Sequence, residues 1–186
     1  MKKLPVAFCI LFLFLFQFSL YSQQKTVDAG IKRIIIIRHG EKPDKGDNLS
    51  CKGLNRALQL PDVIYKKFGV PERIYTPTPD IGGSTGVVRM YQTIVPFAIK
   101  YNLKINTKYD VKDSEKLADA LKKQDGTVLL VWEHKAISKI IKALGIAEKE
   151  HWDDNDFDSI WIVTYHNGTP VLTKDKENIN PTNDCR

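Results

Sequence analysis

Arg38 and His39, two basic side chains suited to holding and attacking an anion, directly follow a run of four isoleucines at 34–37. Such a run is typical of a short strand that is buried on both faces of a parallel sheet. Ligands of open α/β sheets bind just beyond the carboxyl ends of the strands, so we expect both side chains at the mouth of a crevice. Gly40 permits a sharp turn there and leaves room for a ligand. The three residues alone are equally compatible with a basic turn at a strand end.

The same pattern recurs later in the chain, where the apolar segment 127–132 ends directly before Glu133 and His134. A further basic residue, Arg89, lies in a segment with helical spacing. Taken alone, Arg89 is typical of a helix surface, and His134 is compatible with a hydrogen-bonded histidine in the core. Considered with the first pair, His134 is a candidate for the same crevice.

Phosphoryl transfer is the chemistry that these residue types serve best. A neutral imidazole, here His39, has an available lone pair and is not repelled by a phosphate dianion. Arg38 and Arg89 each offer a planar fork of donors that matches phosphate oxygens, which a lysine cannot do. Fixed cations of this kind, together with a hydrogen bond from His134, stabilise the charge on the equatorial oxygens. This arrangement requires no metal, and the sequence has no carboxylate cluster typical of Mg²⁺ sites.

Alternating strand-like and helix-like segments predict a single α/β domain that positions these residues. Ser50 is a candidate N-cap for the first helix, which Pro61 should kink or split. The segment 80–86 is rich in glycine and is expected to be a loop. Asn167 and Gly168 predict a hairpin. The expected strands cover 33–37, 73–75, 103–107, 127–132, 160–163 and 171–172, and the expected helices cover 50–67, 87–101, 114–123 and 136–144.

Four pieces of the sequence resemble the histidine phosphatase (phosphoglycerate-mutase-like) superfamily, and they occur in the order of that family. They cover nearly the whole chain after residue 22. The resemblance implies a single three-layer α/β/α domain with a mostly parallel central sheet. The pieces are Arg38-His39-Gly40 with the helix start Leu49–Ala57, the strand end Ile74–Pro77, the helix segment Arg89–Thr93, and the strand Val128–Trp132 that leads to His134.

The resemblance also implies a role for each candidate site residue. His39 is the nucleophile that accepts the phosphoryl group. Arg38, Arg89 and His134 bind the phosphate. The family's general acid is a Glu that follows the second Arg in many members, or an Asp directly after the second His in others. Here Lys135 follows that His, so the second pattern is absent.

Glu133 is our hypothesis for the proton donor, because a carboxyl at the end of an apolar strand can have a raised pKa and act as acid and then base. Strand alternation, however, predicts that its side chain points away from that of His134. Asp110 and Asp113 are weaker candidates. Glu41 is expected to order the loop through Arg38 or Lys42.

The remaining polar clusters carry no expected chemistry. His151 and His166 are expected to be structural or surface residues. The Asp-rich stretch 153–158 lacks the spacing of an EF-hand and is expected to be a solvated turn. The net charge of +6 is modest and scattered, without the basic and aromatic stripe of a nucleic-acid-binding protein, so no nucleic-acid partner is expected.

Residues 1–22 have the order of a secretory signal peptide, with Lys2 and Lys3 before an apolar stretch and a polar end. Their removal leaves a domain at 23–186 in an exported protein, periplasmic or secreted. The alternative is an uncleaved membrane anchor, although the apolar stretch is short for a spanning helix. In an oxidising compartment Cys51 and Cys185 can form a disulfide, or can remain two free thiols.

The sequence therefore predicts an exported phosphatase that hydrolyses phosphate monoesters through a phosphohistidine on His39, without a cofactor. Its expected partner is a small phosphorylated substrate or a phosphorylated envelope component. An exported glycolytic mutase is not expected, because the substrates of that reaction are cytoplasmic. The alternative is a module that keeps the pocket and binds phosphate or a protein partner, but lacks an effective acid.

Overall fold

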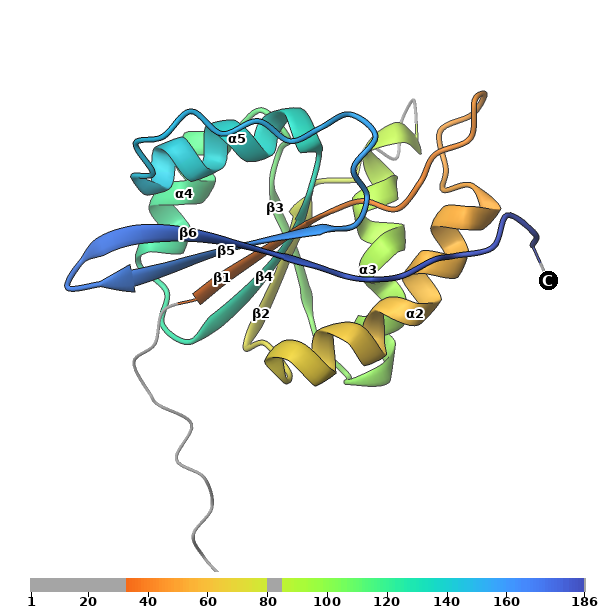
Figure 1. The fold of residues 1–186 in the computed structure, drawn as a ribbon, viewed down its shortest axis with the longest axis horizontal. Helices are drawn as coiled ribbons and strands as arrows, with labels where there is room; N and C mark the ends of the chain where they lie inside the picture. Colours follow the sequence, from red (N-terminus) through yellow and green to blue (C-terminus); the bar gives the residue numbers. More distant parts are fainter. Residues whose placement is uncertain (1–32, 80–84, 186) are drawn as a thin grey trace, which may run out of the picture.

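The structure is a computed structural model that describes residues 33–79 and 85–185 (Figure 1). The signal peptide predicted at 1–22 lies outside these residues. No helix in the described part is long and apolar enough to cross a membrane. The strands are β1 (Arg33–Arg38), β2 (Arg73–Pro77), β3 (Ile105–Tyr109), β4 (Thr127–Trp132), β5 (Ser159–His166) and β6 (Thr169–Lys176). The helices are α2 (Cys51–Phe68), η2 (Thr85–Val87), α3 (Val88–Lys100), α4 (Ser114–Lys122) and α5 (His134–Leu144).

The six strands form one sheet in the order β3-β2-β4-β1-β5-β6. Neighbouring strands from β3 to β1 are parallel, whereas β5 pairs antiparallel with both β1 and β6. Because β1 and β4 are parallel neighbours in the middle of the sheet, their carboxyl ends lie side by side. The residues that follow them, predicted to share a crevice, therefore meet at one edge.

Two helix pairs cover the two faces of the sheet, α2 with α3 on one and α4 with α5 on the other (Figure 1). Successive isoleucines of β1 point to opposite faces. Ile35 and Ile37 pack in the core under α2 and α3, and Ile34 and Ile36 pack in the core under α4 and α5. All four side chains are completely buried. The predicted three-layer α/β/α domain with a mostly parallel sheet is confirmed.

Most element boundaries agree with prediction within a few residues, and two differences are informative. Pro61 was predicted to kink or split the first helix. It does not split α2, which runs through Pro61 as one helix. Leu60 and Ile64 are fully buried on either side of it, and this packing offsets the lost backbone hydrogen bond. Helix α5 begins at His134, two residues before the predicted start. Of the loop predicted at 80–86, residues 80–84 lie outside the described chain.

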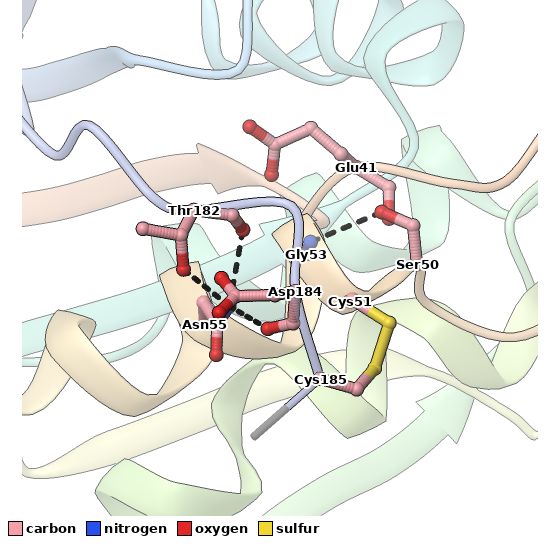
Figure 2. The surroundings of a disulfide bond; sticks show 8 residues. All are labelled: Glu41, Ser50, Cys51, Gly53, Asn55, Thr182, Asp184 and Cys185. Carbon is pink, nitrogen blue, oxygen red and sulfur yellow. Dashed lines mark hydrogen bonds between the residues drawn. A yellow bond between two sulfur atoms is a disulfide. The ribbon is translucent and has the colours of Figure 1, made fainter.

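Cys51 and Cys185 form a disulfide, with their Cα atoms 4.9 Å apart (Figure 2). This resolves the alternative of two free thiols. The bond joins the first residue of α2 to the C-terminal tail. Asn55 holds the same tail by donating its amide hydrogens to the carbonyl oxygens of Thr182, at 3.0 Å, and Asp184, at 2.8 Å. Two independent connections therefore attach the tail to the start of α2.

The start of α2 is in turn attached to the loop after β1. The Ser50 hydroxyl accepts from the Gly53 amide as the N-cap of α2, as predicted, and donates to the backbone carbonyl of Glu41. The Glu41 carboxylate pairs with Arg56 through two hydrogen bonds, of 2.9 and 3.0 Å. Glu41 thus orders the loop through Arg56, and the predicted partners Arg38 and Lys42 are wrong.

A second carboxylate shares the same guanidinium. Glu177, which follows β6 and is 3% exposed, accepts from Arg56 Nη1 at 2.6 Å. One buried cation therefore binds two carboxylates, and a third, that of Asp158, lies 4.0 Å from its Nη1. Burial is the main cause that raises the pKa of Glu177 to about 8, and the charges of Asp158 and Glu41 add to the effect, although Arg56 opposes it.

The raised pKa of Glu177 predicts a loss of stability as the solution becomes alkaline. A carboxyl whose pKa is higher in the folded than in the unfolded protein stabilises the fold fully at pH values below its unfolded-state pKa. That stabilisation is lost as pH rises through the folded-state pKa, here about 8. We expect Glu177→Gln to flatten the decline in unfolding free energy between about pH 5 and about pH 9, measured by urea denaturation. Glu148→Gln, at an exposed position, is the control. Equal slopes in the wild type and Glu177→Gln would contradict this assignment.

Candidate active site

The loop after β1 is held in place by the two other elements that carry candidate residues. The His39 amide donates to the carbonyl of Trp132, the last residue of β4, at 3.3 Å. The Gly40 amide donates to the Thr93 hydroxyl of α3 at 2.9 Å. A Cβ on Gly40 would lie 2.9 Å from the carbonyl oxygen of Gly53, so only glycine allows this close approach to α2.

The His39 ring is positioned as a nucleophile. Its Nδ1 lies 2.7 Å from the carbonyl oxygen of Gly40, which can only accept, so Nδ1 carries the proton and Nε2 keeps its lone pair. The residue is 3% exposed. The pKa of His39 is lowered to about 4, mainly by burial; the charges of Arg38, Arg89 and His134 also lower it, and the Gly40 hydrogen bond opposes them. The imidazole is therefore neutral near pH 7.

Arg38 points one edge of its guanidinium into a loop from the other half of the chain. Its Nη1 donates to the backbone carbonyls of Asp154, at 2.7 Å, and Asp156, at 3.2 Å. The guanidinium lies 3.9 Å from the centroid of the Phe157 ring, a cation–π contact. Arg38 Nε is buried and has no hydrogen-bond partner in the described structure.

Arg89 lies on the first turn of α3 and reaches the segment that precedes α2. Its Nη1 donates to the carbonyl of Asp47 at 3.0 Å, and its buried Nε has no partner among the described residues. Gln92, one turn further, bonds Asn48 and the Leu49 amide. The helix thus holds the 47–49 segment and leaves an N–H of Arg89 available for an anion.

His134 and Glu133 both lie beyond the end of β4. Glu133 is the N-cap of α5 and accepts from the Ala136 amide at 3.1 Å. Its other oxygen lies 3.0 Å from His134 Nδ1. The side chains meet although strand alternation predicted that they would point apart, because the strand ends at Trp132 and alternation does not extend into a helix cap.

The acidic stretch 153–158, predicted to be only a solvated turn, contributes to the site. Asp154 Oδ1 lies 2.8 Å from His134 Nε2. Burial and Arg38 lower the pKa of His134, against the carboxylates of Glu133 and Asp154. The aspartates were visible in the sequence, but no spacing rule connected this loop with the strand ends. The Asp154 side chain is 70% exposed, so it can leave His134 without breaking buried contacts.

Among the described residues, no hydrogen bond, ion pair or ring contact joins the other acids and histidines considered from the sequence to His39. Asp113 accepts from the Asp110 amide and from Lys116. His151 and His166 are exposed. Within residues 33–79 and 85–185, no group of three or more His, Cys, Asp or Glu side chains is arranged to hold a metal ion.

The assembled geometry is suited to binding an anion and attacking it. A neutral imidazole with a free lone pair is surrounded by two guanidiniums and a second imidazole, and a carboxyl group contacts that second ring. Cations placed in this way stabilise an oxyanion that develops beside the nucleophile. The roles of the five predicted residues, Arg38, His39, Arg89, Glu133 and His134, remain predictions.

No protein-family model and no curated protein matches the sequence. Solved structures, however, share the fold. The protein histidine phosphatase SixA, complexed with tungstate, superposes with a TM-score of 0.60 at 14% identity over 78% of this chain and 97% of its own. The α-ribazole phosphatase of Shigella flexneri gives 0.56 at 11% identity, over 76% of this chain and 94% of its own.

A phosphoserine phosphatase mutant from Entamoeba histolytica, in complex with phosphoserine, is a third structure with this fold. Its TM-score is 0.54 at 15% identity, and the match covers 78% of this chain and 96% of that one. At these identities the likeness establishes the architecture. The resemblance expected from the sequence motifs is therefore confirmed at the level of the fold.

Proposed function

Because the chain has the fold of the histidine phosphatase superfamily, we propose that it is a phosphatase that hydrolyses phosphate monoesters through a phosphohistidine on His39. The observation that carries the proposal is the free Nε2 of a neutral, buried His39 beside two guanidiniums and a second imidazole. The similar structures, whose names describe phosphatases of phosphohistidine, phosphoserine and α-ribazole phosphates, support the same activity.

The proposed reaction has two displacements at phosphorus. His39 Nε2 forms a bond to phosphorus while the bond to the ester oxygen breaks, and Glu133 gives its proton to the leaving alcohol. Water then attacks the phosphohistidine, Glu133 takes a proton from that water, and the N–P bond breaks to release phosphate. Arg38, Arg89 and His134 hold the equatorial oxygens in both steps. The steps derived from these residues need no metal ion.

Substrate binding requires one rearrangement in this scheme. In the present conformation Asp154 occupies His134 Nε2, the atom that would donate to a phosphate oxygen. A phosphate dianion would displace the Asp154 carboxylate, because both anions cannot occupy that donor. The exposed position of Asp154 makes the exchange inexpensive.

We further propose that the protein is exported, with residues 1–22 as a cleaved signal peptide. The Cys51–Cys185 disulfide supports this, since such bonds persist in oxidising compartments. The expected substrates are small phosphorylated molecules or phosphorylated envelope components. If the N-terminal segment is retained, the domain would act at a membrane surface. The mass of the mature N-terminus distinguishes the two forms.

The experiment that tests the function is capture of phosphate on His39. The 23–186 protein is mixed with p-nitrophenyl phosphate and EDTA, quenched in base, which preserves phosphohistidine, and digested for mass spectrometry. We expect one phosphoryl group on the peptide that contains His39. A binding module, the alternative function, would retain phosphate reversibly without forming this adduct.

A further inference from the structure

A cavity of about 620 Å³ adjoins the candidate active site on the side of Glu133. Its walls come from the end of β2, the start of α3, the turn before α4 and the first turns of α4 and α5. His39, Arg38, Arg89 and His134 are absent from its lining, whereas Glu133 is part of it. Glu133 therefore forms a wall shared by this cavity and the phosphate site, through its contact with His134.

Three lysines line the cavity, of which Lys112 also acts on the charge of Asp113 and Lys135 on that of Asp154. Lys135 and Lys139 lie one turn apart on α5, and Lys112 lies in the turn before α4. None of the three forms an ion pair with a residue in the described part of the chain. Among the described residues of the lining the acids are Asp110 and Glu133, so three lysines face two carboxyl groups there.

An unsatisfied hydroxyl at the start of α4 points to the same kind of ligand. Ser114, the first residue of α4, lines the cavity and is 5% exposed, yet its hydroxyl has no hydrogen-bond partner in the described structure. Asp113, at the N-cap, makes no capping hydrogen bond with its side chain. The first amides of α4 thus lack a side-chain acceptor, although the carboxylates of Asp113 and Glu115 lie at the same helix start, and the positive end of the helix dipole favours an anion there.

We propose that this cavity holds the leaving group of the substrate, and that the leaving group carries an anionic group of its own, a carboxylate or a phosphate. The inference rests on the proposed phosphatase function and adds the substrate class. Its anion binds Lys112, Lys135, Lys139 and the Ser114 hydroxyl. In this position the ester oxygen faces Glu133, the group proposed to protonate it.

The test compares two esters that differ in charge and little in shape, meta-carboxyphenyl phosphate and meta-carbamoylphenyl phosphate. The variants are Lys112→Gln/Lys139→Gln and the matched control Lys123→Gln/Lys149→Gln, which removes two charges at exposed positions outside the cavity. We expect kcat/KM of the wild type to favour the carboxylate ester at least about tenfold, mainly through KM. The cavity variant should lose this preference, and the control should keep it.

Equal use of the two esters by the wild type, or a preference that survives Lys112→Gln/Lys139→Gln, would overturn the inference. The uncharged leaving group of p-nitrophenyl phosphate separates this failure from failure of the phosphatase function, because it has no anion for the lysines to bind. If no ester is hydrolysed, the phosphatase function fails, and calorimetric titration with meta-hydroxybenzoate and meta-hydroxybenzamide tests the cavity directly. Lysine-dependent binding of the carboxylate alone supports the site, and equal binding of both compounds excludes it.

Discussion

Replacing His39 by alanine is expected to lower kcat for p-nitrophenyl phosphate at least about a thousandfold, which corresponds to roughly 4 kcal/mol of activation free energy. The variant loses the lone pair of His39, the imidazole that lies beside the guanidiniums of Arg38 and Arg89 in the described structure. Arg38, Arg89 and His134 can still bind phosphate, so the variant should retain affinity for inorganic phosphate while its turnover is lost. Rates are measured in EDTA with the 23–186 protein.

His151→Ala is the matched control, because His151 is an exposed histidine outside the site. It should leave kcat unchanged. Activity that persists in EDTA and disappears only with His39 would establish covalent catalysis on this residue. If His39→Ala and the wild type turn over the ester at the same rate, the mechanism is overturned, whether that rate is high or low.

Loss of the Cys51–Cys185 disulfide is expected to lower the free energy of unfolding by up to about 5 kcal/mol in the chain-entropy description. The bond closes a loop of the chain between residues separated by 134 positions, nearly the whole domain. Without it, the unfolded ensemble gains the freedom of that loop. The tail would then be held to α2 mainly by Asn55 and by the Glu177–Arg56 pair.

Urea denaturation of Cys51→Ser/Cys185→Ser against the oxidised wild type measures this effect. Wild type treated with a reductant should behave like the variant, and reductant should not affect the variant. Activity is a second readout, because Cys51 follows Ser50, which holds the Glu41 carbonyl in the loop that carries His39. An unchanged urea midpoint in the variant would contradict the predicted stabilisation.

The sequence alone determined the layered fold and the edge at which the site forms. A run of four isoleucines has no polar face, so the strand that contains it must be covered on both sides, and this explains the observed packing of Ile34 to Ile37 into two cores. Neighbouring parallel strands bring the residues beyond their carboxyl ends to one edge of the sheet. The positions of Arg38, His39 and His134 were therefore predictable from local pattern.

Contacts between distant segments were decided only by the tertiary structure. The carbonyls of 154 and 156 on Arg38, the carboxylate of Asp154 on His134, and Arg56 between Glu41 and Glu177 each join residues far apart in the chain. No local periodicity encodes such partners. The orientation of Glu133 was mispredicted for the same reason, since the backbone changes from strand to helix at that residue. Local pattern sets where a strand ends, and packing of the whole chain sets which groups surround its last side chain.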